Sequence, residues 1–178
     1  GWMRFQQGDI VGAGKYYRYA LAAVEGSDVM LHSTALAGKR AGLANVELVQ
    51  SRWNDALKLY QERDRGLRSD AAQFKRTGSG QVGWVYALHK TGQSQRAAQM
   101  AGNMISNQLR GPVVIRWYIA QLRGVQGMAL ASSGKTAEAL KAYRESIPEL
   151  IRRDQDDATE EDTGYWRTYW QRVILESY

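Results

Sequence analysis

The sequence predicts an all-α protein of antiparallel helical hairpins, stacked one after another, with a further helix at the C-terminal end. Three observations lead to this prediction. Only two prolines occur in 178 residues, so long stretches contain no residue that breaks a helix. A small-residue turn recurs at spacings of 43, 41 and 42 residues. The residues that follow each turn carry an apolar pattern of helical period.

The repeated pattern has four members, and the first is truncated. The turn residues are Gly8, Ser51, Gly92 and Gly134. An alanine follows five residues later (Ala13, Ala56, Ala97 and Ala139), and nine residues later come Tyr17, Tyr60, Ala101 and Tyr143. Seven residues before the turns stand Gly1, Ala44, Val85 and Gly127. Small residues let two helices approach closely, and a glycine allows the positive φ that ends the first helix of a hairpin.

This pattern defines the helices in order. We expect helices at 1–6 and 9–25, 28–49 and 53–66, 69–90 and 94–109, 112–132 and 136–153, and a last helix at 158–178. Ser94 and Thr136 suit helix N-caps, as do Asp28 and Ser69. Pro112 suits the first turn of a helix, whereas Pro148 should loosen the end of its helix. The repeats therefore occupy residues 1–153, and an acidic linker and a capping helix occupy residues 154–178.

The turn, the alanine and the aromatic residue together resemble the tetratricopeptide repeat (TPR), although the period is longer than the usual ~34 residues. The resemblance covers nearly the whole chain and implies a right-handed solenoid. It also implies a non-catalytic scaffold that binds a peptide or a partner helix in a concave groove. The groove candidates are Asn45, Leu48, Tyr86, His89, Lys90, Gln121 and Met128. Trp2 and Phe5 suit either the groove or the apolar end of the stack.

One specialised TPR mode is not expected here. The TPR site for peptide carboxyl termini requires basic residues at set positions of the first helices. Ala41 and Gln121 stand where that site has lysines, and only Asn45 matches it.

The C-terminal 40 residues carry a second resemblance. The segments Ile147-Pro148-Glu149-Leu150 and Ile174-Leu175-Glu176-Ser177-Tyr178, on either side of an acidic linker, resemble the junction in bacterial CHAT-domain proteins. In that family TPR repeats precede a caspase-like protease domain. The resemblance implies that an adjacent protease domain of the same chain is a partner. None of its chemistry transfers to these residues, because the sequence contains no cysteine.

The last helix has an apolar stripe of its own. Trp166, Tyr169, Trp170 and Val173 recur at helical spacing, flanked by Tyr165 and Ile174. Repeat stacks need a terminal element that covers the last apolar face. We expect this helix to cap the stack by packing against the helix that ends near Arg153; the alternative is a linker helix to a following domain.

Charge is distributed unevenly. The net charge is +6, but residues 154–178 carry −5 and residues 1–153 carry +11. Basic side chains gather around Arg63, Arg65, Arg68, Lys75 and Arg76. The alternative function is therefore a helical repeat that binds nucleic acid through the basic body. No recognition-helix, zinc or aromatic–basic strand pattern supports it, so we expect a protein or peptide partner instead.

Enzymatic motifs are not supported. Ser133-Gly134-Lys135-Thr136 lacks the earlier glycine and the strand of a P-loop. Gly78-Ser79-Gly80-Gln81-Val82-Gly83 lacks the βαβ unit of a dinucleotide site. His32 and His89 have no partners at ligand spacing. We therefore expect no enzyme activity, no cofactor and no metal site. No apolar run approaches the ~20 residues of a membrane span. The sequence does not determine the cellular compartment, and the cytoplasm is favoured over the periplasm or secretion.

Overall fold

The computed structural model describes residues 1–25, 33–68, 81–152 and 164–178, and within these ranges every regular element is an α-helix. The fold class that the sequence predicts is therefore confirmed at the level of an all-helical protein. The helices are α1 (Trp2–Gln6), α2 (Ile10–Glu25), α3 (Ser33–Val49), α4 (Trp53–Arg68), α6 (Val82–Lys90), α7 (Ser94–Arg110), α8 (Arg116–Ala131), α9 (Thr136–Ile151) and α10 (Tyr165–Leu175).

Several boundaries differ from the expected ones. α8 begins at Arg116, because Ile115 is still extended at φ −93° and ψ 97°. The expectation that Pro112 lies in the first turn of this helix is therefore wrong. The helix beginnings at Ser94 and Thr136 are as expected, but the capping residues are Gln93 and Lys135, and neither makes a side-chain capping hydrogen bond. Asp28, Ser69 and the acidic linker lie outside the described residues.

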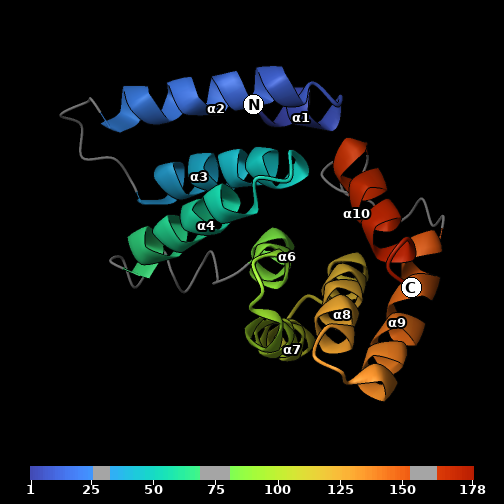
Figure 1. Cartoon of the computed structure of the whole chain (residues 1–178). Helices are drawn as coiled ribbons and strands as arrows, with labels where there is room; N and C mark the ends of the chain where they lie inside the picture. Colours follow the sequence, from blue (N-terminus) through green and yellow to red (C-terminus); the bar gives the residue numbers. More distant parts are fainter. Residues whose placement is uncertain (26–32, 69–80, 153–163) are drawn as a thin grey trace. The chain divides into compact units, whose positions relative to one another are not determined.

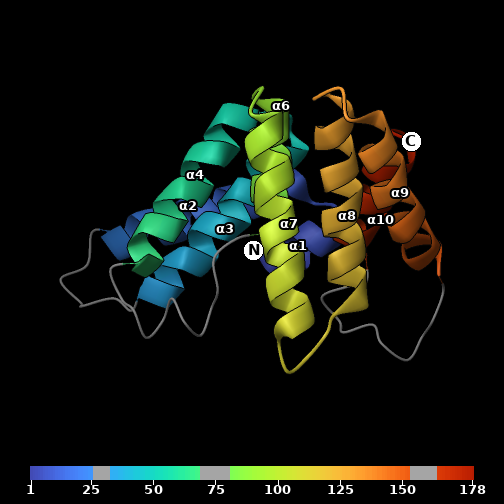
Figure 2. The same cartoon turned by 90° about the horizontal axis from the view of Figure 1, so that it is seen from below.

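The chain divides into two compact units, residues 1–87 and residues 88–178. In the first unit α2 packs on α1 and on α3, and α3 packs on α4 (Figure 1). In the second unit α8 packs between α7 and α9, as the view from below shows (Figure 2). α10 packs on both α8 and α9. Within each unit, consecutive helices thus form antiparallel hairpins that lie side by side.

The four turns close with the same hydrogen bonds. The N–H groups of Gly8, Ser51, Gly92 and Gly134 each bond the carbonyl three residues earlier, and the next N–H bonds the carbonyl five residues before it. This pair of bonds is the Schellman motif, which requires a left-handed residue at the turn. The φ angles of the four turn residues are 81°, 60°, 82° and 76°. The sequence repeat is therefore a repeat of backbone geometry.

The small residues of the repeat hold the hairpins together. The alanines at the fifth position after each turn, Ala13, Ala56, Ala97 and Ala139, are at most 2% exposed. Tyr17 lies against two glycines: a Cβ at Gly1 would come 2.6 Å from its ring, and a Cβ at Gly42 would overlap it. A Cβ at Gly83 would likewise overlap the Tyr60 hydroxyl. The aromatic ring of one hairpin therefore packs on a glycine in the first helix of the next hairpin.

Pro148 lies inside α9, which nevertheless continues to Ile151. Its ring nitrogen cannot donate the usual helical bond, so the last turn has one bond fewer. The Leu150 carbonyl near this end accepts 2.6 Å from Gln171 Nε2, and the Arg152 carbonyl accepts 3.0 Å from Arg167 Nη2. Both donors belong to α10, so α10 satisfies carbonyl groups at the end of α9.

None of the described helices combines the length and the apolar character that a bilayer crossing requires.

Candidate functional site

The predicted groove residues differ in accessibility. Leu48 is fully buried, and Tyr86, Gln121 and Met128 are 5–7% exposed. Asn45 and His89 are half-buried, and Lys90 is exposed. Phe5 is 1% exposed and stacks on the half-buried Trp2 with a centroid separation of 5.7 Å. Of the predicted groove residues, only Asn45, His89 and Lys90 present appreciable surface, because the other members of the set are buried.

Asn45 and His89 both make contacts within their own unit. Asn45 Oδ1 accepts a 2.5 Å hydrogen bond from the Tyr60 hydroxyl, so it fixes the ring that packs on Gly83. His89 Nδ1 lies 3.1 Å from Ser94 Oγ across the turn between α6 and α7. Burial lowers the pKa of His89, and the positive charge of Lys90 lowers it further. His89 is therefore held neutral at physiological pH.

Two cavities recur at the same register of the repeat, each bordered by the second helix of one hairpin and by the next hairpin. In the first unit a cavity of about 480 Å³ is lined by Arg18, Glu47, Arg52, Asp55, Lys58, Leu59 and Glu62. In the second unit a cavity of about 410 Å³ is lined by Gln95, Ala98, Gln99, Gln126, Leu130, Ser133, Lys135 and Glu138. Both volumes lie within the range of small ligand sites.

The cavity of the first unit is charged and internally paired. Glu47 is 6% exposed, and its carboxylate accepts from Arg18 Nη1 at 3.1 Å and from Arg52 Nε. This hydrogen bond to Glu47 raises the pKa of Arg52. Lys58 and Glu62 lie 4.0 Å apart on α4. Since these charged groups already have partners, a charged ligand would have to break existing ion pairs before binding here.

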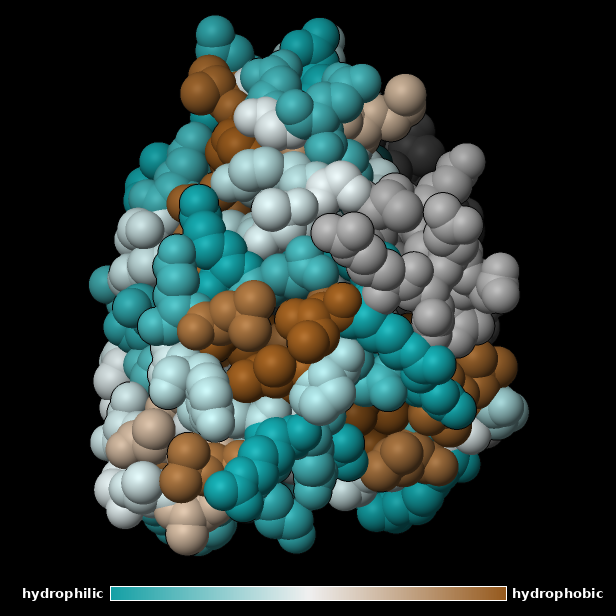
Figure 3. Space-filling view, turned by 90° about the vertical axis from the view of Figure 1, so that its right-hand side faces the viewer, coloured by the Kyte–Doolittle hydropathy of each residue, from teal (hydrophilic) through white to brown (hydrophobic). Residues whose placement is uncertain are grey.

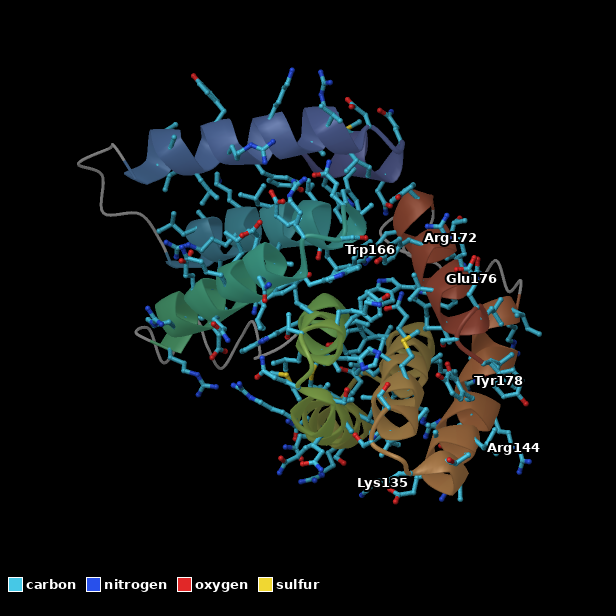
Figure 4. All side chains as sticks on the ribbon, viewed as in Figure 1. Lys135, Arg144, Trp166, Arg172, Glu176 and Tyr178 are labelled. Carbon is cyan, nitrogen blue, oxygen red and sulfur yellow. The ribbon has the colours of Figure 1, made fainter. Side chains whose placement is uncertain are left out.

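The cavity of the second unit is lined mainly by uncharged residues. Leu130 takes the register position that Glu47 takes in the first unit, four residues before the turn. Three glutamine amides line the space, and the charged pair Lys135–Glu138, 3.5 Å apart, is exposed. Figure 4 shows Lys135 at the N-terminal end of α9. The cavity is therefore predominantly neutral and polar, with amide groups that can both donate and accept hydrogen bonds.

The C-terminal helix packs through part of the predicted stripe. Tyr169 and Trp170 are buried, with Trp170 fully so, whereas Trp166 and Val173 are half-buried. Ile174, expected only at the flank, is fully buried, and a Cβ at Gly124 of α8 would come 2.6 Å from its Cδ1. The buried face is therefore rotated slightly toward Ile174, so that α10 contacts α8 as well as α9.

Further contacts fix both ends of α10. Arg167 lies over the Trp117 ring at 4.5 Å from its centroid, which is a cation–π distance. At the other end the Tyr143 hydroxyl lies 3.1 Å from Ser177 Oγ, and the rings of Tyr143 and Tyr178 meet edge to face at 5.4 Å. Figure 4 shows Tyr178 beside α9. Tyr143 thus contacts the residues that follow α10, at the register position where Tyr17 and Tyr60 contact the next hairpin.

Some apolar residues of α9 and α10 remain exposed: Leu140, Ile151 and Leu175. Figure 3 views the molecule from the side of Figure 1 on which these helices lie, and it shows apolar patches separated by hydrophilic side chains.

The sequence stretches that resemble catalytic motifs have structural roles in the described residues. Gly134 provides the positive φ of a hairpin turn, and Ser133 Oγ donates 2.8 Å to the Ala129 carbonyl. No group of three or more His, Asp or Glu side chains in the described ranges is arranged to hold a metal ion. His32, Gly78 and Gly80 lie outside the described residues.

Residue patterns alone missed the two cavities. Glu47 was detectable as an acidic residue at a register position that is apolar in the third and fourth repeats, Leu88 and Leu130. The glutamines of the second unit carried no such signal, because glutamine is common on exposed helix faces.

Neither a known protein family, nor a curated protein, nor a solved structure matches this chain. The inference of function therefore rests on the residues and their geometry.

Proposed function

We propose that this chain is a non-catalytic protein-interaction scaffold of TPR-like repeats, binding a peptide or a partner helix. The single observation that supports the proposal most is the fourfold recurrence of the same Schellman turn, with an alanine buried five residues later. Repeats of this kind contact mainly their neighbours, and they generate extended surfaces suited to protein partners. The chain would serve as the interaction or regulatory region of a larger protein resembling the CHAT-domain proteases.

The distribution of charge supports a protein partner over nucleic acid. Several basic side chains of the described residues are paired with acids: Arg18 and Arg52 with Glu47, Lys58 with Glu62, Arg68 with Asp64, Arg123 with Glu145, and Arg152 with Glu149. Binding of nucleic acid draws on cations that are available to phosphates. Pairing on the protein reduces the field that these cations would present.

A photo-crosslinking experiment tests the proposal. A benzoylphenylalanine replaces Lys90, which is exposed at the end of α6, and a matched variant carries it at Lys141, which is exposed on α9. We expect a specific protein to crosslink at Lys90 and to rebind the purified chain with a Kd in the micromolar range or tighter. Crosslinking only at Lys141 would mean that the scaffold binds its partner through the second helices of the hairpins, such as α9, and not through α6.

Two results would contradict the scaffold proposal. One is the failure of any purified protein to bind. The other is retention of nucleic acid with an affinity that falls steeply with salt, as counterion release requires. The proposed link to a protease is tested separately: the gene that encodes this chain should encode a domain with a His/Cys pair downstream of Tyr178.

A further inference from the structure

The cavity of the second unit continues into a neighbouring hollow. The cavity of about 410 Å³ and a hollow of about 510 Å³ at the beginning of α7 share Gln95 and Ser133. The hollow adds Gln93, Ser94, Arg96 and Ser132 to the lining. The two form one continuous surface along α7, which we call the amide trough and define by Gln95, Ala98, Gln99, Gln126, Leu130 and Ser133.

We propose that the amide trough binds an extended segment of another polypeptide through its main chain. This inference rests on the proposed scaffold function and specifies a surface and a mode of binding for it. It differs from binding in the groove of the first helices, because two of the residues that carry it, Gln95 and Gln99, lie on α7, the second helix of its hairpin.

The spacing of the glutamines matches that of an extended chain. Gln95 and Gln99 stand four residues apart on α7, which corresponds to a rise of about 6 Å along a helix. Alternate residues of an extended peptide are about 6.6 Å apart. Each carboxamide carries one acceptor and two donors, so it can bond both the N–H and the C=O of a main chain. Two such groups at this spacing can engage alternate residues of one peptide.

The glutamines are available for such bonds. Both Gln95 and Gln99 are exposed, and no hydrogen bond of either side chain is present among the described residues. Gln126, in contrast, is fixed: its Nε2 donates 3.2 Å to the Ala98 carbonyl, which leaves its Oε1 as an acceptor. Ser133 Oγ donates to the Ala129 carbonyl and keeps lone pairs that can accept. The trough thus combines two adaptable groups on α7 with two that are held in place.

The lining favours a peptide over a sugar or a charged ligand. Ala98 is half-buried and provides a small apolar contact for one side chain of an extended peptide, whereas Leu130 is 8% exposed and presents little surface. The lining of the cavity and of the hollow contains no aromatic ring, which is the flat apolar surface against which a sugar ring would pack. The exposed Lys135 and Glu138 neutralise each other at 3.5 Å, and Arg96 of the hollow donates 2.9 Å to Gln93 Oε1. The other polar groups of the lining are uncharged amides and hydroxyls, and main-chain amides are the ligand that they match best.

The second helix of the second hairpin, α4, provides an internal control. Asn54 has the repeat position of Gln95, three residues after the turn, and it is not part of the lining of the first unit's cavity. Lys58 has the position of Gln99 and faces the acid Glu62. Removing amides from α4 should therefore leave peptide binding unchanged, whereas removing them from α7 should abolish it.

The experiment uses the whole 178-residue chain and a phage-displayed library of random nonapeptides. Enriched sequences are synthesised with blocked ends, and their Kd is measured by fluorescence anisotropy. We expect the double variant Gln95→Ala/Gln99→Ala to weaken binding at least tenfold. The control Asn54→Ala/Gln61→Ala, which removes the amides of two α4 residues, should stay within twofold. Methylation of alternate main-chain nitrogens in the peptide should weaken binding to a similar degree. The side-chain amide NMR signals of Gln95, Gln99 and Gln126 should shift on titration.

Three results would overturn the amide trough as a peptide site. One is equal affinity of the α7 variant and the unsubstituted chain for the peptide, which would mean that the scaffold function uses another surface. Another is a shift of the same amide signals by maltohexaose, which would assign the trough to a carbohydrate. The third is a library that yields no binder. If, in addition, no protein crosslinks at Lys90 or Lys141, the scaffold function fails as well.

Discussion

Ser51 occupies a backbone conformation that the other three repeats give to glycine. Its φ is 60°, and it is the only residue other than glycine with a positive φ in the described ranges. A side chain in the left-handed region costs roughly 1–2 kcal/mol, because Cβ approaches the following carbonyl oxygen. The second hairpin therefore contains a strained turn.

Ser51→Gly should raise the free energy of unfolding by up to about 1 kcal/mol. The relief of strain exceeds the entropy that glycine adds to the unfolded chain, which is about 0.4–1 kcal/mol. Urea unfolding followed by circular dichroism measures the change. Ser51→Ala is the matched control and should not stabilise; a gain of equal size in both variants would show that strain is not the cause.

Two glycines lie one turn apart on α3, and substituting each by alanine should change the stability in opposite directions. A Cβ at Gly38 meets nothing within 4 Å, so Gly38→Ala should stabilise the helix by about 0.5–1 kcal/mol. A Cβ at Gly42 would overlap the Tyr17 ring, so Gly42→Ala should destabilise by about 1–2 kcal/mol after the helix gain is subtracted. Thermal unfolding of both variants checks this, and a shift in the same direction would refute the packing of Tyr17 on Gly42.

At this scale the sequence predicts packing better than polar chemistry. The register identifies the buried alanines and Tyr17, Tyr60 and Tyr143, because they recur at fixed distances from a turn. It does not identify Glu47, whose two arginine partners are Arg18 on α2 and Arg52 in the turn before α4. Such a cluster depends on the approach of separate helices, and a single repeat does not encode it.

At the scale of elements, α10 is held chiefly by Trp170, which is fully buried, while Trp166 is half-buried. Trp170→Ala should therefore reduce the free energy of unfolding by roughly 3–5 kcal/mol. Trp166→Ala should cost clearly less, because that ring is only half-buried; it stacks on Tyr169 at a centroid distance of 5.4 Å and meets Trp170 edge to face at 5.1 Å. Urea unfolding of the two variants measures the difference. Similar losses would mean that α10 packs through a different face.

The turn between α6 and α7 should respond to pH. Burial, together with Lys90, lowers the pKa of His89 below the value of about 6.5 expected in the unfolded chain. Below that pH the unfolded chain binds more protons than the folded one, so the free energy of unfolding decreases as the pH falls below about 6.5. Above that pH the contribution of neutral His89 to the free energy of unfolding is complete. Equilibrium unfolding between about pH 7.5 and 5.5 measures this slope.

His89→Gln should flatten the slope, and Lys90→Gln, which removes the lesser cause, should reduce it without abolishing it. A slope that is unchanged in the His89 variant would assign the pH dependence to another group.

The beginning of α8 was not predictable from the sequence pattern. α8 begins four residues later than expected, because Gly111 and Ile115 are extended and Gln108 Nε2 bonds the Val113 carbonyl at 2.9 Å. That bond joins a side chain to a carbonyl five residues away and has no periodic signature. Helix ends, in contrast, were predictable where a turn glycine fixes the backbone, as at Gly92 and Gly134.

At the scale of the whole molecule, the pairs of helices that pack within each unit are neighbours in the chain, apart from α10 against α8. In such repeats stability is approximately a sum of local terms. Gly42→Ala should therefore lower the hydrogen-exchange protection of α3 and α4 about tenfold, since a loss of 1.4 kcal/mol is a factor of ten. Protection in α8 and α9 should stay within twofold, as exchange followed by NMR will show. A uniform fall would demonstrate one cooperative unit.

The pairing of large and small residues between hairpins also bears on errors of assembly. Tyr17 faces Gly42 and Tyr60 faces Gly83, but the third repeat has Ala101 at the tyrosine position. The repeat that follows it has Val125 where the others have glycine. A tyrosine placed against Val125 would clash, and Ala101 placed against a glycine would leave a void. The interface between the third and fourth hairpins is thus incompatible with the tyrosine–glycine pairing of the first two interfaces, which disfavours exchange of these hairpins between chains during folding.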